Sequence, residues 1–164
     1  MLSFIKEADK MDISILLDIL RKSFASVAER FNLTLENCPK NLAFCTEQRI
    51  EDDFARGLIY YILEEDGRPY GCVALEKAGA DVCYLERLAI LPEHRRKGFG
   101  KALVNHIFDM AIKTGIQRVE IGIISEDTEL KKWYRKFGFV SKGTKRFNHL
   151  PFIVEFMFAE LKET

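Results

Sequence analysis

The spacing of apolar residues in the first third of the chain predicts helices. A short apolar stretch at 4–6 fits a first strand, and apolar residues then recur every three to four positions from 11 to 31. That period places them on one side of a long amphipathic helix. Residues 32–45 are rich in loop formers. Thr46 is a suitable N-cap for a short second helix, and Gly57 favours its end.

After this point the period changes to that of strands. Residues 58–65 and 69–77 predict two strands joined at Asp66-Gly67, which is a strong signal for a tight hairpin. A further strand is predicted at 82–91 and ends before a proline. The middle of the chain is therefore expected to form a sheet of antiparallel strands.

The C-terminal part alternates between the two periods. The predicted helices and strands follow in the order helix 98–113, strand 118–124, helix 127–136, strand 139–145 and strand 152–161. Together with the N-terminal elements this gives the order β-α-α-β-β-β-α-β-α-β-β. The expected fold class is therefore a mixed α/β layered fold with about four helices.

Composition supports one globular domain covering residues 1–164. The chain of 164 residues is 48% hydrophobic and 30% charged, which excludes a disordered or fibrous protein. Its longest apolar run, 58–63, is far shorter than the roughly 20 residues that a membrane helix requires. The N-terminus becomes charged within a few residues, so no secretory signal is visible. We expect a soluble, cytoplasmic protein with no membrane partner.

The net charge of zero conceals an uneven distribution. The first 82 residues carry 10 Lys/Arg and 15 Asp/Glu, whereas residues 83–164 carry 15 and 10. A zero total argues against a dedicated nucleic-acid-binding protein, which would need many phosphate contacts. The basic C-terminal half still permits an anionic ligand there.

The cysteines and histidines predict no metal site. Cys38, Cys45, Cys72 and Cys83 lack the two-residue spacing of a zinc knuckle or a thioredoxin-like motif, and the three histidines are scattered. We expect free, buried thiols in a reducing compartment.

The most informative segment is a glycine-rich turn between a strand and a helix. The predicted strand at 82–91 leads into Arg95-Arg96-Lys97-Gly98-Phe99-Gly100, which opens the next helix. The glycines let the backbone approach a ligand closely, and the free N–H groups of a first helical turn attract anions. The segment lacks the G-x-x-x-x-G-K-[ST] pattern of a P-loop, and residue 103 is leucine where G-x-G-x-x-G needs glycine. The sequence therefore predicts a pyrophosphate site of another kind.

Two motifs together resemble those of the GNAT superfamily of N-acyltransferases. Arg95-x-x-Gly98-x-Gly100 is similar to the acyl-CoA-binding signature of that family, and Trp133-Tyr134-Arg135-Lys136-Phe137-Gly138-Phe139 is similar to its F-Y-x-K-x-G-F segment. The element order over 3–161 also fits. The resemblance implies a single GNAT-like domain with a mixed, mostly antiparallel central sheet whose central strands splay apart.

The resemblance also implies acetyl-CoA as co-substrate, without a metal, and assigns residues to it. The backbone of Leu88, Ala89 and Ile90 would pair with the pantetheine arm. The residues implied to hold the pyrophosphate are Arg95, Arg96, Lys97, Gly98, Phe99, Gly100 and Lys101. Tyr134 would lie near the thioester sulfur. The family often has asparagine where this chain has Asp127; a carboxylate cannot donate the same hydrogen bond, and Asp127 could instead cap its helix.

Acyl transfer to an amine needs a base, an oxyanion donor and an acid for the departing thiolate. Tyr134 is the candidate acid, and a backbone N–H near residues 88–90 is the candidate donor. Glu86 is the candidate base, because strict alternation would place Tyr84, Glu86, Leu88 and Ile90 on one face of the strand. His149, in the turn before the last strand, is the alternative base.

These observations predict an acetyl-CoA-dependent N-acetyltransferase that works by direct attack in a ternary complex. The acceptor would be a small-molecule amine or a peptide amine, whose identity no motif reveals. A non-catalytic acyl-CoA-binding or sensing module on the same fold is the alternative. A weaker alternative is an RNA- or ribosome-associated protein that uses the basic C-terminal half. Whether the chain forms a homodimer is left open.

Overall fold

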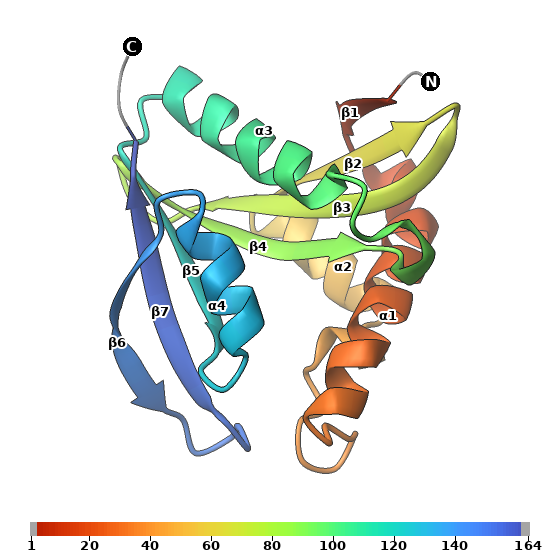
Figure 1. Ribbon diagram of the computed structural model, residues 1–164. Helices are drawn as coiled ribbons and strands as arrows, with labels where there is room; N and C mark the ends of the chain where they lie inside the picture. Colours follow the sequence, from red (N-terminus) through yellow and green to blue (C-terminus); the bar gives the residue numbers. More distant parts are fainter. Residues whose placement is uncertain (1–2, 162–164) are drawn as a thin grey trace. The chain divides into compact units, whose positions relative to one another are not determined.

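The structure, a computed structural model, describes residues 3–161 and confirms the predicted order of elements (Figure 1). The strands are β1 (Ser3–Glu7), β2 (Ile59–Glu65), β3 (Arg68–Lys77), β4 (Val82–Ile90), β5 (Arg118–Ile124), β6 (Val140–Arg146) and β7 (Ile153–Glu160). The helices are α1 (Ile13–Arg30), α2 (Glu47–Ala55), α3 (Phe99–Lys113) and α4 (Thr128–Arg135), with short 3₁₀ turns at Lys10–Asp12, Leu42–Phe44 and Pro92–His94. Boundaries agree with the sequence-based ones to within about two residues.

The strands form one mixed, mostly antiparallel sheet, as predicted. Their hydrogen-bonding order is β1-β2-β3-β4-β5-β7-β6. The pairs β1–β2, β2–β3, β5–β7 and β6–β7 are antiparallel, whereas β4 and β5 are parallel over Val82–Tyr84 and Arg118–Glu120. A parallel pair needs a long crossover, and the residues between these two strands include α3.

The described residues fall into two compact units. The first contains the chain up to Glu76 together with Leu85–Ile107, and the second contains Lys77–Tyr84 and the chain from Phe108 onward. Strand β4 and helix α3 contribute to both. The candidate cofactor turn and Glu86 belong to the first unit, and Tyr134 belongs to the second.

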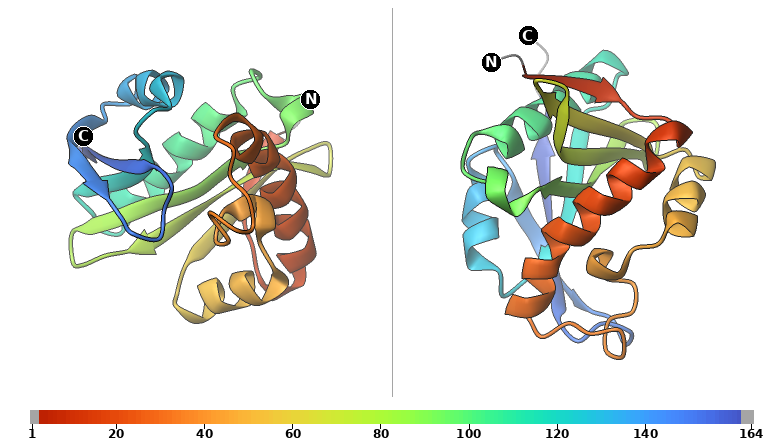
Figure 2. Two further views of the ribbon diagram at one scale, coloured as in Figure 1. Left: turned by 90° about the horizontal axis from the view of Figure 1, so that it is seen from below. Right: turned by 90° about the vertical axis from the view of Figure 1, so that its right-hand side faces the viewer.

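The core of the first unit lies between the sheet and helices α1 and α2; Figure 2 shows α1 in red to orange. Its buried members include Leu16, Ile19 and Leu20 from α1, Ile50 from α2, Tyr60 and Ile62 from β2, Cys72 and Ala74 from β3, and Ala89 from β4. Leu103 of α3 lies beside Gly71 of β3 and is fully buried. Helices therefore pack against strands on both faces of this part of the sheet.

In the second unit, helix α4 carries aromatic side chains that pack on one another. Phe139, just after α4, is 1% exposed, and its ring centroid lies 5.4 Å from that of Tyr134 and 5.8 Å from that of Phe108. Strand β6 lies at the edge of the sheet and every one of its residues is exposed.

The structure contains the hairpin turn and the helix caps that neighbouring residues predict. Asp66 and Gly67 have φ values of 53° and 79°, which suit the tight β2–β3 hairpin. The Thr46 hydroxyl accepts a hydrogen bond from the Arg49 N–H at 3.2 Å and so caps α2. Asp127 caps α4 in the same way, since its carboxylate accepts from the Leu130 N–H at 3.2 Å. Within residues 3–161, no helix is both long and apolar enough to cross a membrane.

Candidate active site

Strand β4 is interrupted at Arg87, where the backbone becomes left-handed. The φ of Arg87 is 56°, a value disfavoured for any residue with a side chain. A residue of this kind inside a strand is typical of a β-bulge, which breaks the alternation of side chains between the two faces of a sheet. Side chains before and after Arg87 therefore do not follow one two-residue period.

The left-handed Arg87 breaks the strict alternation on which the prediction that Glu86 shares a face with Ile90 depends. Ile90 and Leu103 of α3 both lie against Gly71. Glu86 instead lies close enough to Asp53 of α2 for the two charges to interact. Glu86 thus lies within electrostatic range of charged groups on α2 and β3, whereas Ile90 lies beside Leu103 of α3.

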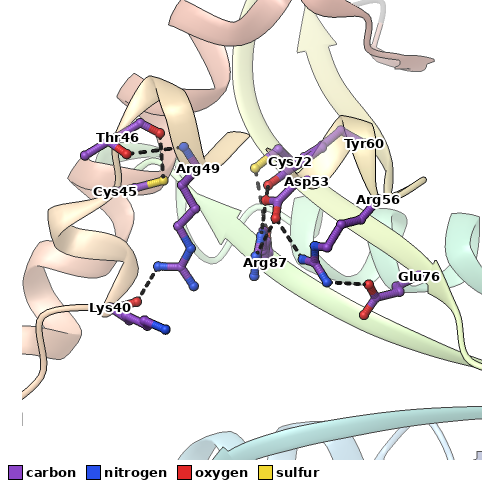
Figure 3. A network of polar contacts seen from close by, with 10 residues as sticks. All are labelled: Lys40, Cys45, Thr46, Arg49, Asp53, Arg56, Tyr60, Cys72, Glu76 and Arg87. Atoms are coloured by element: carbon purple, nitrogen blue, oxygen red, sulfur yellow. Dashed lines mark hydrogen bonds and ion pairs between the residues drawn. The ribbon is translucent and has the colours of Figure 1, made fainter. Parts of the chain in front are cut away.

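Next to Glu86 lies a network of charged and polar groups on α2, β2, β3 and β4, which Figure 3 shows in close-up. We call it the Asp53 cluster, and its members are Asp53, Arg56, Tyr60, Glu76 and Arg87. Asp53 is 2% exposed and is the centre of the cluster.

Asp53 accepts hydrogen bonds from three side chains. Arg87 donates from Nε at 2.8 Å and from its terminal nitrogen at 3.0 Å, one bond to each carboxylate oxygen. Arg56 donates at 2.9 Å, and the Tyr60 hydroxyl donates to the other oxygen. Burial raises the pKa of Asp53, but the bonds from Arg87 and Tyr60 outweigh it and leave this pKa below its ordinary value. Asp53 is therefore held as a carboxylate.

Glu86 is a half-buried carboxyl group with spare hydrogen-bonding capacity. Its Oε2 atom is buried and has no hydrogen-bond partner within the described part of the chain. Burial raises the pKa of Glu86, the charge of Arg87 lowers it, and the net shift is upward. A carboxylate with a raised pKa and a free acceptor atom is suited to receive a proton.

The predicted anion site lies in the turn between β4 and α3. Arg96 and Gly98 have φ values of 65° and 85°, so two left-handed residues occur within three positions just before α3 begins at Phe99. Turns of this kind gather backbone N–H groups into a concave anion site. The first intrahelical bond runs from the Ala102 N–H to the Gly98 carbonyl at 3.1 Å, so the N–H groups ahead of Ala102 stay available at the helix start.

The space and charge around this turn fit a pyrophosphate. A Cβ built on Gly98 would meet no atom within 4 Å, so the turn is open on that side. Arg96, Lys97 and Lys101 are exposed there. Residues Leu88–Ile90 of β4 precede the turn in the same unit. The turn and its cations could hold a diphosphate, which is the role that the sequence predicts for them.

The Arg95 side chain, predicted to contact the pyrophosphate, is bonded to helix α1 in this structure. Its guanidinium donates to the Ser26 hydroxyl at 3.0 Å and to the Ser23 carbonyl at 2.8 Å, both on α1. Its backbone N–H donates to the Pro92 carbonyl at 3.3 Å. Arg95 thus ties the turn to α1, and a phosphate contact from its side chain would require these bonds to be exchanged.

Tyr134 is a buried residue of α4 in the second unit. It is 5% exposed, and its ring packs edge-on against those of Trp133 and Phe139, with centroids at 5.0 and 5.4 Å. Burial raises the pKa of Tyr134, so its hydroxyl keeps its proton at neutral pH. Lys131 anchors the same helix to β7 through a 2.6 Å ion pair with Glu155. A protonated hydroxyl on an anchored helix is suited to donate a proton.

The alternative base, His149, lies in an exposed turn. Its ring centroid is 5.7 Å from that of Phe147, and it belongs to the same unit as Tyr134. The four cysteines are buried and free. Among residues 3–161, no three His, Cys, Asp or Glu side chains come together as metal ligands.

Sequence reasoning missed the Asp53 cluster. One signal was available: Asp53 stands three residues after Ile50, on the apolar side of a short amphipathic helix. A carboxylate on the buried face of a helix requires a buried partner. The identity of that partner could not be read, because Arg87 is 34 residues away.

The chain folds as an α/β protein with a left-handed turn and exposed cations directly before α3. The profile of the acetyltransferase (GNAT) family matches residues 24–139, and the chain belongs to this family. An amino-acid acetyltransferase from Neisseria meningitidis is 37% identical over 81 residues, which are 49% of this chain and 18% of that protein. The chain therefore matches less than a fifth of that relative's length.

Solved structures show the same fold over nearly the whole chain. The ribosomal-protein-S18-alanine N-acetyltransferase from Escherichia coli superposes with a TM-score of 0.79 at 15% identity, covering 99% of this chain and 96% of that one. The PaiA N-acetyltransferase from Thermoplasma acidophilum, solved in complex with coenzyme A, superposes with a TM-score of 0.75 at 19% identity, covering 98% and 99%.

Proposed function

We propose that this protein is an N-acetyltransferase that transfers an acetyl group from acetyl-CoA to an amine by direct attack in a ternary complex. The observation that carries the proposal is the open, left-handed turn at Arg96–Gly98, directly before α3, with three exposed cations beside it. An anion site at the start of a helix fits the diphosphate of coenzyme A. Family membership supports this cofactor.

The residues of the turn bind and orient. The N–H groups of Phe99 and Gly100 and the cations Arg96, Lys97 and Lys101 would hold the diphosphate, and the backbone of Leu88–Ile90 would pair with the pantetheine arm. When bound, acetyl-CoA supplies a thioester that an amine can attack, with formation of the C–N bond and loss of the thiolate. A backbone N–H of this strand segment would stabilise the oxyanion.

Glu86 and Tyr134 would move the protons. The free Oε2 of Glu86 can accept the proton of the attacking amine, directly or through one water. Tyr134 would give its proton to the departing thiolate; its raised pKa keeps the hydroxyl protonated at neutral pH, but also makes it a weaker acid than an exposed tyrosine. The family resemblance implies that Tyr134 lies near the thioester sulfur.

The acceptor that we propose is the amine of an amino acid or a peptide. One relative is named for amino acids and one structural neighbour for an alanine of a ribosomal protein. The half-buried carboxyl group of Glu86 also favours an acceptor that arrives as an ammonium ion.

The test is release of the CoA thiol from acetyl-CoA in the presence of a panel of amino acids, peptides with different N-terminal residues, and polyamines. Turnover with one or more acceptors is expected, with KM values in the ordinary enzyme range of about 1 μM–1 mM. Binding of CoA without turnover on any acceptor would favour the acyl-CoA-binding module instead.

A pair of variants tests the anion site itself. Gly100→Glu places a carboxylate at the start of α3, where it would occupy the diphosphate position, so calorimetry should detect no CoA binding. Asn105→Glu adds the same charge to an exposed position farther along the helix and should leave CoA affinity nearly unchanged. Undiminished CoA affinity in Gly100→Glu would overturn the assignment of the turn.

A further inference from the structure

The strained residue of β4 is held by a partner from another element. Arg87 has a φ of 56°, and a non-glycine residue keeps such a conformation only where its surroundings fix it. Both the side chain and the backbone carbonyl of Arg87 have partners here. Its guanidinium is bound by Asp53, and its carbonyl accepts a weak bond from the Cys72 thiol at 3.6 Å.

The bond between Arg87 and Asp53 is two-pronged and buried. Nε and a terminal nitrogen of Arg87 bind different oxygens of the same carboxylate, at 2.8 and 3.0 Å. The exposed fractions of the two side chains are 11% and 3%. A bidentate pair fixes orientation as well as distance, and burial protects it from salt and water. Asp53 thus determines where the Arg87 side chain points.

Asp53 is itself fixed by the rest of the cluster. Tyr60 of β2 and Arg56, the C-cap residue of α2, both donate to it, and Arg56 also binds Glu76 of β3 at 2.8 Å. Each oxygen of Asp53 thus accepts two hydrogen bonds, and together the four bonds fix the position of the carboxylate.

We propose that Asp53 is a positioning residue for acetyl transfer: by holding Arg87 in its left-handed conformation, it sets the direction of the Glu86 carboxylate and of the β4 backbone that follows. The proposal rests on the proposed function, in which Glu86 accepts the amine proton and residues 88–90 meet the thioester. Asp53 does not touch the reacting groups. It acts through Arg87, the residue next to Glu86.

A purely electrostatic effect of Asp53 on Glu86 can be distinguished from its effect on the position of Arg87. The charged groups that influence Glu86 are Arg87 on its own strand, Glu76 on β3, Asp53 on α2 and Arg56 at the end of that helix. Asp53 and Glu76 are both carboxylates, both bind Arg56 and both raise the pKa of Glu86. Of the two, Asp53 is the one that binds Arg87. Glu76→Gln is therefore a matched control for Asp53→Asn.

The experiment compares the steady-state kinetics of these two variants, with an amine that the native protein acetylates as the acceptor. Asp53→Asn should lower kcat by about 10- to 10²-fold, the range expected for misplaced reacting groups, with the Kd for CoA within about threefold of wild type. Glu76→Gln should keep kcat within about threefold. Equal losses in the two variants, or a normal kcat in folded Asp53→Asn, would overturn the proposal.

A second variant covers the case in which Asp53→Asn does not fold, since it leaves the buried Arg87 charge without its anion. The double variant Asp53→Asn/Arg87→Gly removes both charges, and glycine adopts a φ of 56° without strain. It should fold and bind CoA, yet remain at least about tenfold slow, because nothing holds the left-handed turn in one orientation. Wild-type kcat in this double variant would also overturn the proposal.

Amide hydrogen exchange separates this proposal from the proposed function. If the native protein shows no transferase activity with any acceptor, the proposed function fails, but exchange in the peptide covering 85–90 still reports on the bulge. Asp53→Asn should exchange there at least about tenfold faster than wild type, and Glu76→Gln should not. Unchanged exchange in Asp53→Asn would show that Asp53 does not hold β4.

Discussion

Burial makes Glu86 a stronger base than an exposed glutamate, and the neighbouring Arg87 opposes this effect. An ordinary glutamate, with a pKa of about 4.3, is a weak base toward an amine, whose pKa is about 10.4. Burial raises the pKa of Glu86 toward the useful range, and the adjacent Arg87 guanidinium opposes that shift. A water molecule held between Glu86 and the acceptor would let a moderate base of this kind act.

Glu86→Gln is expected to cut kcat/KM by about 10- to 10³-fold, because an amide cannot accept the amine proton. The acidic limb of the pH profile should lie above the ordinary glutamate pKa in the native protein and disappear in this variant. Steady-state kinetics between about pH 5 and pH 9 measure both effects.

His149→Ala is the control for that experiment, because loss of a histidine base would lower the rate more than loss of Glu86. The exposed position of His149 favours an unchanged rate in this variant. A crippled His149→Ala beside a normal Glu86→Gln would transfer the role of base to His149.

Tyr134→Phe is expected to lower kcat while leaving CoA affinity nearly intact, because it removes one hydroxyl and almost no packing area. General acid catalysis contributes roughly 10²–10⁴-fold, and the lower end applies because a thiolate with a pKa of about 8.5 leaves tolerably without help. Single-turnover kinetics give the rate of the chemical step. An unchanged chemical step would exclude Tyr134 from the mechanism.

At the scale of elements, the spacing between β3 and β4 depends on Gly71. A Cβ at this position would lie 2.6 Å from Ile90 Cδ1 and 2.9 Å from the Ala89 carbonyl oxygen. The isoleucine tip can rotate away, but the carbonyl belongs to the backbone of β4. A glycine inside a strand often marks such a close approach.

Gly71→Ala should therefore destabilise the fold by about 1–3 kcal/mol, the usual cost of overpacking, and should weaken CoA binding by shifting β4. Urea unfolding and calorimetry measure the two effects. Gly79→Ala is the matched control, since a Cβ there meets no atom within 4 Å and its stability and affinity should stay near wild type. Equal behaviour of the two variants would contradict the close approach.

Elements that are determined by neighbouring residues could be predicted from the sequence. The Asp66-Gly67 hairpin, the Thr46 cap and the Gly57 exit of α2 all follow from residues within a few positions, and the structure confirms each. The anion turn was predicted for the same reason, because strand, cations, glycines and helix are consecutive in the chain.

The conformation of β4 could not be predicted in this way. Arg87 carries no local signal for a left-handed φ, since that region favours glycine. What fixes Arg87 is Asp53, 34 residues earlier in the chain, and a period-2 pattern contains no information about such a partner. The strict alternation assumed for β4 therefore fails at Arg87.

At the scale of the whole molecule, Asp53 and Glu86 affect stability in opposite directions. Four hydrogen bonds lower the pKa of Asp53 despite its burial, so its ionised form stabilises the fold above the ordinary aspartate pKa, and this contribution is lost as the pH falls through its folded-state value. The pKa of Glu86 is raised, so its ionisation at neutral pH costs stability. The protein thus retains a destabilising charge next to a stabilising one, which is typical of a functional site.

Glu86→Gln should therefore become more stable than the native protein as the pH rises. Below the ordinary pKa of 4.5, the carboxyl is protonated in both the folded and the unfolded chain, and its contribution is complete. Between that value and the raised pKa the folded state binds more protons than the unfolded state, so the free energy of unfolding falls with increasing pH. Glutamine does not titrate and escapes this loss. Urea unfolding of both proteins at about pH 4 and about pH 7 should show the stability difference moving in favour of Glu86→Gln at the higher pH, whereas the same difference at both pH values would mean that folding does not raise the pKa of Glu86.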